Sequence, residues 1–146
     1  MKTKVCAILL AALLCFSSVA SALTAEQNKK LESIAALLNI MQKDYNFGDD
    51  FEEPFFEFTE DPAMMRMHFT YKGYETYLLS LVLDASPSTS KAPLLDLCQS
   101  CYNMLREATQ DIAADLPIVV TIGGNDGGVS LYTINGLDVS DYIIEE

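Results

Sequence analysis

The feature that most constrains the fold is a stretch of strict alternation in the middle of the chain. Over residues 65–72 every second residue is apolar and the residues between are polar. The apolar members are Met65, Met67, Phe69 and Tyr71, and the polar members are Arg66, His68, Thr70 and Lys72. Because successive side chains of a strand point to opposite faces of a sheet, this pattern predicts a strand with one buried face.

Two more strands are expected beside this one. A short strand begins near Pro54, since Phe56 and Phe58 alternate with polar neighbours. After a turn at Lys72-Gly73, the run 74–84 reads as a longer strand that is apolar on both faces, which predicts a place inside the sheet. Short turns join all three segments, so we expect them to pair antiparallel.

Two helices flank these strands in the sequence. Thr24 and Gln27 form a capping box that opens a helix over residues 25–45. Its apolar stripe is Leu31, Ile34, Leu38, Met41 and Tyr45, widened by Leu37 and Ile40. A second helix is expected over 92–115, and Pro117 ends it. Its apolar seam is Leu94, Cys98, Cys101, Leu105, Ala108 and Ile112.

The C-terminal part reads as a hairpin. Residues 118–122 and 129–134 have strand patterns, and the glycine-rich run 123–128 joins them. Asn125 and Asp126 beside glycine are typical of a turn that needs positive φ, so we interpret this loop as turn chemistry. Residues 137–144 fit either a short helix or one more strand.

The order is therefore helix, three antiparallel strands, helix, two strands and a candidate C-terminal helix. This predicts an α+β fold with the helices packed on one face of a mainly antiparallel sheet. The order resembles that of the type III secretion chaperone-like fold. The resemblance implies a protein that binds protein partners and is not an enzyme, although most members of that fold are cytoplasmic.

The first 22 residues predict a secretory signal peptide. Lys2 and Lys4 provide a basic start, Val5 to Phe16 are apolar, and Ala20-Ser21-Ala22 offers a cleavage site. We expect cleavage after Ala22 and export of residues 23–146, to the periplasm or the medium, as a single domain. The apolar run is too short to cross a bilayer, which needs about 20 residues, so no membrane insertion is expected.

Charge limits the choice of partners. The whole chain carries a formal net charge of −12, and loss of Lys2 and Lys4 leaves seven basic against 21 acidic residues, or −14. Such a surface repels nucleic-acid phosphates and anionic lipids. We therefore expect no nucleic acid and no membrane surface as partner, but a protein, and a protein with a basic face fits the charge.

The densest acidic region is residues 44–61. Eight of these eighteen residues are acidic, none is basic, and five are phenylalanine. The phenylalanines indicate that parts of the tract pack, while the acids remain available to a partner. The candidate partner-binding residues are Phe47, Asp49, Asp50, Phe51, Glu52, Glu53 and Phe55.

Cys98 and Cys101 are the two cysteines that remain after cleavage. Export to an oxidising compartment favours a disulfide between them, whereas their place on the apolar seam favours buried free thiols. A thiol-disulfide redox or sensing role is the third alternative, although the pair lies after the first helical turn, where the dipole no longer stabilises a thiolate. Two cysteines and His68 are too few for a zinc site, and no cofactor is expected.

Calcium provides a further alternative. Asp44, Asn46 and Gly48 start like an EF-hand loop, but Asp49 replaces the glycine at its sixth position and Phe55 the glutamate at its twelfth. We find no nucleophile motif, and His68 reads as a surface residue. The leading hypothesis is an exported, non-catalytic acidic binding module; the alternatives are a redox protein using Cys98 and Cys101 and a calcium-stabilised structural protein.

Overall fold

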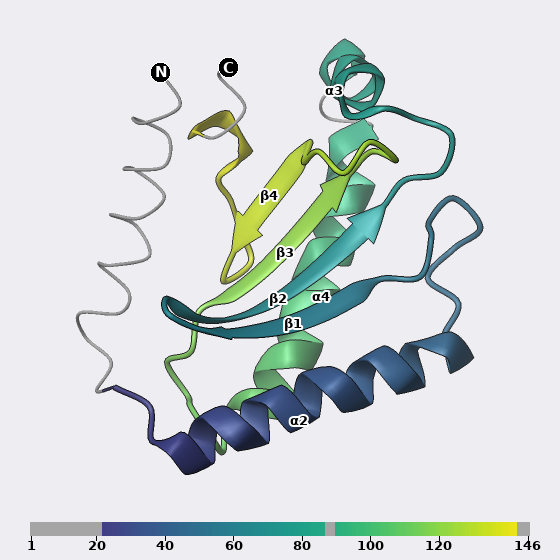
Figure 1. The fold of residues 1–146 in the computed structure, drawn as a ribbon. Helices are drawn as coiled ribbons and strands as arrows, with labels where there is room; N and C mark the ends of the chain where they lie inside the picture. The colour runs from purple at the N-terminus through teal and green to yellow at the C-terminus, as the bar shows by residue number, and fades with distance from the viewer. Residues whose placement is uncertain (1–21, 87–89, 143–146) are drawn as a thin grey trace.

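The computed structural model describes residues 22–86 and 90–142, so the expected signal peptide lies outside the described residues except for Ala22. Its centre is a sheet of five strands in the order β1-β2-β3-β4-β5 (Figure 1). The strands are β1 (Phe55–Glu60), β2 (Ala63–Thr70), β3 (Ile118–Gly123), β4 (Leu131–Ile134) and β5 (Leu137–Asp138). The sheet is mainly antiparallel and carries helices, which confirms the α+β class.

One pair of strands is parallel. β2 and β3 run side by side in register from Met65 opposite Ile118 to Thr70 opposite Gly123. Parallel neighbours need a crossover connection. Here it contains α3 (Thr76–Ala85) and α4 (Ala92–Thr109), which brings the two halves of the chain together at the centre of the sheet.

The N-terminal helix covers the edge of the sheet. α2 (Ala25–Met41) begins at the predicted capping box of Thr24 and Gln27 and continues as a 3-10 turn over Gln42–Asp44. It runs beneath β1 (Figure 1). The Asn39 amide donates to the Phe56 carbonyl at 2.7 Å and accepts from the Phe56 N–H at 2.8 Å. Asn39 thus takes the place of a neighbouring strand at this edge.

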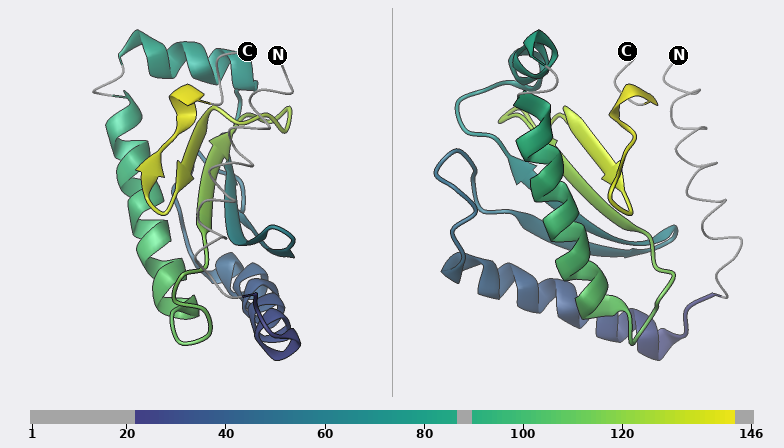
Figure 2. Two further views of the ribbon diagram at one scale, coloured as in Figure 1. Left: turned by 90° about the vertical axis from the view of Figure 1, so that its left-hand side faces the viewer. Right: turned by 180° about the vertical axis from the view of Figure 1, so that it is seen from behind.

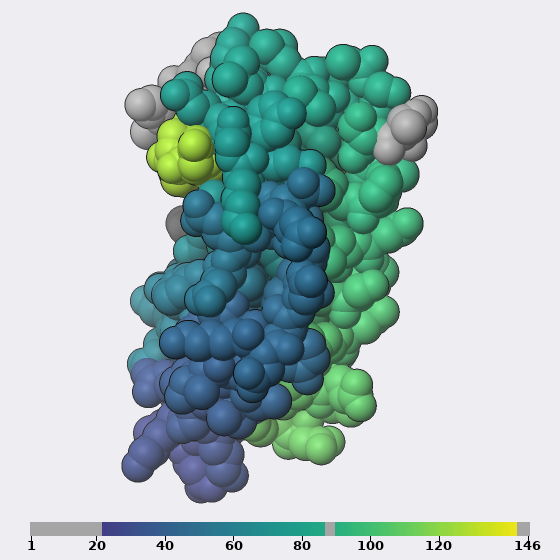
Figure 3. All heavy atoms as spheres, turned by 90° about the vertical axis from the view of Figure 1, so that its right-hand side faces the viewer, coloured from purple at the N-terminus to yellow at the C-terminus, as the bar shows by residue number. Residues whose placement is uncertain are grey.

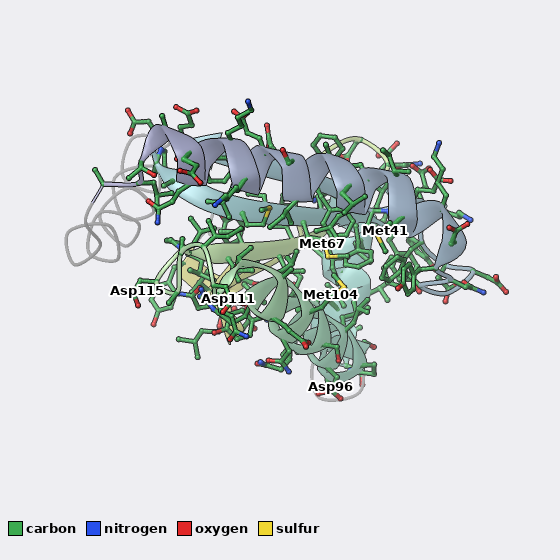
Figure 4. All side chains as sticks on the ribbon, turned by 90° about the horizontal axis from the view of Figure 1, so that it is seen from below. Met41, Met67, Asp96, Met104, Asp111 and Asp115 are labelled. Atoms are coloured by element: carbon green, nitrogen blue, oxygen red, sulfur yellow. The ribbon has the colours of Figure 1, made fainter. Side chains whose placement is uncertain are left out.

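The main core lies between the sheet and its helices. The predicted buried face of β2 is confirmed, since Met65, Met67 and Phe69 are fully buried. α4 crosses this face (Figure 2), with Cys98 and Leu105 also inaccessible. From below, Met67 lies between α2 and α4, with the partly exposed Met41 and Met104 nearby (Figure 4). A smaller cluster of Met64, Val119, Tyr132 and Ile134 forms a second buried group.

The strand expected over residues 74–84 is wrong, because the chain forms α3 there. Leucine dominates this run, and leucine is a good helix former. Leu79 and Leu83, four residues apart, are the two buried positions, so the helix needs only one narrow apolar face. Two strands and a helix therefore stand where three strands were expected, and the order differs from the one that suggested the chaperone-like resemblance.

Other boundaries differ less. α4 ends at Thr109, whereas the sequence predicted a helix as far as residue 115. Turns connect Thr109 to β3. The undecided C-terminal stretch contains the short strand β5 and then a 3-10 turn, Ser140–Tyr142. The apolar stripe of α2 is wider than the core, so Leu37 and Ile40 are exposed. No described helix is long and apolar enough to cross a membrane.

Candidate binding surface

Five aromatic rings form a continuous chain beside the end of β2. Neighbouring centroids lie 5.1 to 5.5 Å apart, and every pair meets edge to face. In order, this aromatic chain is Phe47, Phe69, Phe51, Tyr71 and Tyr74. Edge-to-face pairs stabilise by about 0.5–1.5 kcal/mol beyond the area they bury. The buried Phe69 therefore anchors the other four rings, of which three are partly buried and Tyr74 is exposed.

Backbone contacts fix the acidic segment, which we define as residues 49–53, to the same place. Phe51 and Tyr71 form an isolated antiparallel bridge. The Glu52 N–H donates to the Thr70 carbonyl at 2.9 Å, and the Lys72 N–H donates to the Asp50 carbonyl at 2.8 Å. The segment thus extends the β1–β2 pairing and is not a loop without backbone contacts.

A groove of about 500 Å³ opens between the aromatic chain and the helices α3 and α4. All rings of the chain except Phe69 line one side, and Asp50 lies among them. Apolar residues of the two helices also line it: Leu79, Val82 and Leu83 of α3, and Pro93, Leu94 and Leu97 of α4. Figure 3 faces this side, with α3 in teal at the top, the chain around residue 50 in blue below it and α4 in green. The volume lies within the range of ligand-binding clefts in proteins.

Of the four acidic side chains of the segment, only Asp50 lines this groove. The other three line a smaller hollow, which Lys43 and Lys72 also line. This hollow has a volume of about 290 Å³, and Asp49, Glu52 and Glu53 are exposed. The Glu53 carboxylate accepts a hydrogen bond from the Gln42 amide at 3.2 Å. Burial and the charge of Asp50 raise the pKa of the Tyr71 phenol, so that tyrosine is neutral at physiological pH.

Six of the seven candidate partner-binding residues therefore lie around one surface, and Phe55 does not. Phe55 is 58% exposed and is paired with His68 on β2. Its neighbour Phe56 points into the core, so alternation places Phe55 on the opposite face of the sheet. Residues that are close together in the acidic sequence therefore do not all lie on the same surface of the protein.

The glycine-rich loop has a role that sequence reasoning missed. Asp126 accepts hydrogen bonds from the N–H and the hydroxyl of Thr76, the first residue of α3. α3 has no side-chain cap of its own, so Asp126 caps it from the loop between β3 and β4. The Thr76 hydroxyl is the largest influence that lowers the pKa of Asp126.

Close packing explains two of the loop's glycines. A Cβ on Gly124 would lie 2.3 Å from the Thr76 nitrogen, and one on Gly128 would lie 2.3 Å from the Thr76 hydroxyl oxygen. Gly127 has φ +81°, which fits the predicted turn. The loop is thus both a turn and the support of α3, and only the first role follows from its sequence.

Cys98 and Cys101 are free, buried thiols in the structure. Burial raises the pKa of each thiol to about 12. A redox cysteine needs an accessible thiolate. The structure, with both sulfurs free and buried, therefore fits the buried-thiol alternative.

His68 is partly buried and not the surface residue we expected. Its Nδ1 lies 2.7 Å from the Thr121 hydroxyl. Burial, aided by the charge of Arg66, lowers the pKa of His68 and so favours the neutral ring. Within residues 22–86 and 90–142 no three His, Cys, Asp or Glu side chains are grouped to hold a metal ion, so no calcium site is assigned there.

Comparisons with known proteins give no family for this chain. A scan of protein-family models found no match, and searches of curated proteins and of solved structures found none either.

Proposed function

We propose that this protein is an exported, non-catalytic binding module that captures a partner protein through the acidic segment and the groove beside it. One observation carries the proposal. Four exposed carboxylates, those of Asp49, Asp50, Glu52 and Glu53, project from a segment that Phe51 and backbone hydrogen bonds hold in place. A fixed display of like charges costs less entropy on binding than a flexible one.

The partner is expected to present a basic face. Complementary charge steers association and weakens with salt, because the Debye length falls from about 30 Å at 0.01 M to about 10 Å at 0.1 M ionic strength. The apolar groove would supply the affinity that remains at moderate salt. Export rests on the N-terminal sequence pattern alone.

The test is affinity capture from a fraction that contains exported proteins, at low and at moderate salt. We expect a basic partner to be retained at low salt and to be depleted as salt rises. The test variant is D49N/D50N/E52Q/E53Q, which removes four charges and keeps the side-chain sizes. We expect it to lose the partner.

The matched control removes four exposed acids elsewhere. D96N/E107Q/D111N/D115N changes the net charge equally but lies on α4 and the turns that follow it, where Figure 4 labels three of these residues. It should retain the partner. Equal loss in both variants would mean that overall charge acts without a site, and recovery of no partner by wild-type protein would contradict the proposal.

A further inference from the structure

α3 exposes an apolar face that no other described element covers. Leu79 and Leu83 point into the core, but the other large apolar side chains of the helix do not. Tyr77 is 71% exposed, Leu78 47%, Leu81 48% and Val82 44%. A ten-residue helix at the surface does not need these residues for its own packing.

These side chains form ridges that suit another helix. Tyr77 and Leu81 are four residues apart, as are Leu78 and Val82, so each pair forms one row along the helix surface. Such rows pack into the grooves of a neighbouring helix. Val82 also lines the groove described above, so the apolar face and the groove form one continuous surface. α3 is about 15 Å long, which matches three turns of a partner helix.

Acidic residues surround this surface. Glu75 precedes α3, Asp84 lies in its last turn, and Asp50 lines the groove. Among the described side chains, none of these three carboxylates forms an ion pair with a Lys or Arg. An occupant with cationic side chains on its flanks would therefore meet unpaired opposite charge along its length.

An extended peptide cannot pair with a strand of the sheet at this surface. β2, the strand nearest the groove, is paired with β1 on one side and β3 on the other. Beyond the end of β2, Tyr71 already bridges to Phe51. A bound segment could not add a strand here, which leaves helix-in-groove recognition as the mode that the surface fits.

We propose that the occupant is a cationic amphipathic helix of a partner protein. Its apolar side chains lie against Leu78, Leu81 and Val82 and enter the groove, and its lysines or arginines lie beside Asp50, Glu75 and Asp84. This inference rests on the proposed function and names the partner's binding element. A second copy of this chain fits poorly, because it carries the same net charge of −12, and anionic lipid is repelled for the same reason.

The probe is a fluorescent peptide of leucine and lysine, about 18 residues or five helical turns long, in amphipathic order. We measure fluorescence anisotropy against the purified chain. We expect saturable binding that weakens as salt rises. A peptide of the same composition in scrambled, non-amphipathic order should bind at least about tenfold more weakly, a difference of about 1.4 kcal/mol.

Three variants locate the site. L78Q/L81Q replaces exposed leucines on α3 and should weaken binding at least about tenfold, while circular dichroism and thermal unfolding check that the fold is kept. L37Q/I40Q makes the same kind of change on α2, where both residues are also exposed, and should bind as wild type does. D50N/E75Q/D84N should weaken binding and flatten its salt dependence.

Several results would overturn the inference. These are absence of binding, equal binding of the scrambled peptide, and equal loss in the α2 variant. Adsorption of the chain to zwitterionic lipid vesicles that L78Q/L81Q abolishes would assign the face to membranes, and self-association abolished by the same variant would assign it to a second copy. If the capture experiment recovers a basic partner that L78Q/L81Q still binds, this inference fails and the proposed function stands. If the peptide binds and no partner is captured, the proposed function fails.

Discussion

At the scale of single residues, Asp126 determines whether α3 has a capped start. Replacing Asp126 by alanine removes the acceptor of the Thr76 N–H and hydroxyl. We expect a lower urea midpoint of unfolding and less helix by circular dichroism. Asn125→Ala, an exposed neighbour in the same loop, is the control and should leave both unchanged.

The effect of Asp126→Ala should depend on pH. Hydrogen bonds lower the pKa of Asp126 in the folded chain below its ordinary value of 3.8, so the folded state favours the carboxylate. Its contribution to stability is present above the unfolded pKa and is lost as pH falls through the folded one. The difference between wild type and variant should therefore vanish in acid. A difference that persists there would mean that the carboxylate's charge is not involved.

Cys98 and Cys101 predict a loss of stability in alkali. Each thiol has a folded pKa of about 12 against an ordinary 9.0, so folding favours the protonated form. The contribution is complete below about pH 9 and is lost as pH rises through about 12. We expect the urea midpoint to fall over this interval, and to fall less in C98A/C101A.

Alkylation gives an independent check on the same pair. Iodoacetamide at neutral pH should modify the thiols only after urea unfolds the chain. Equal rates in folded and unfolded chains would contradict their burial and would favour the redox alternative.

At the scale of elements, Asn39 joins α2 to the edge of the sheet. Asn39→Ala leaves the N–H and carbonyl of Phe56 without their partner. Removing one partner of such groups costs about 1–3 kcal/mol, and we expect a decrease of that size in the free energy of unfolding, measured by urea denaturation. Ser33→Ala, which removes only an exposed hydroxyl on the same helix, should have little effect. Equal effects of the two changes would show that the edge contact is not important.

The secondary-structure elements differ in how well the sequence predicted them. β2 was predictable because strict alternation of apolar and polar residues fits a strand and does not fit a helix. α2 was predictable because its capping box and its apolar stripe both indicate a helix that begins at the same place. α3 was not, since a leucine-rich run satisfies either element and its cap comes from Asp126, fifty residues away. The candidate site was recovered in part: charge pattern identified the acidic segment, but the groove depends on α3 and so could not be found.

At the scale of the whole molecule, net charge should limit stability at low salt. Self-repulsion of a chain with a net charge of −12 disfavours the compact state, and salt screens it. We expect sodium chloride to raise the urea midpoint. In D96N/E107Q/D111N/D115N the net charge becomes less negative, from −12 to −8, and the effect of salt on the urea midpoint should be smaller. A midpoint that does not respond to salt would mean that the charges lie too far apart to repel.

The support of α3 by the glycine-rich loop has a consequence for the order of assembly. β3 and the loop that follows it come late in the chain, yet they pair with β2 and cap α3. One wall of the groove is therefore complete only when the C-terminal third has folded. Contacts between such distant segments form slowly. A nascent or truncated chain would lack the proposed docking face, so recognition by this route is reserved for finished molecules.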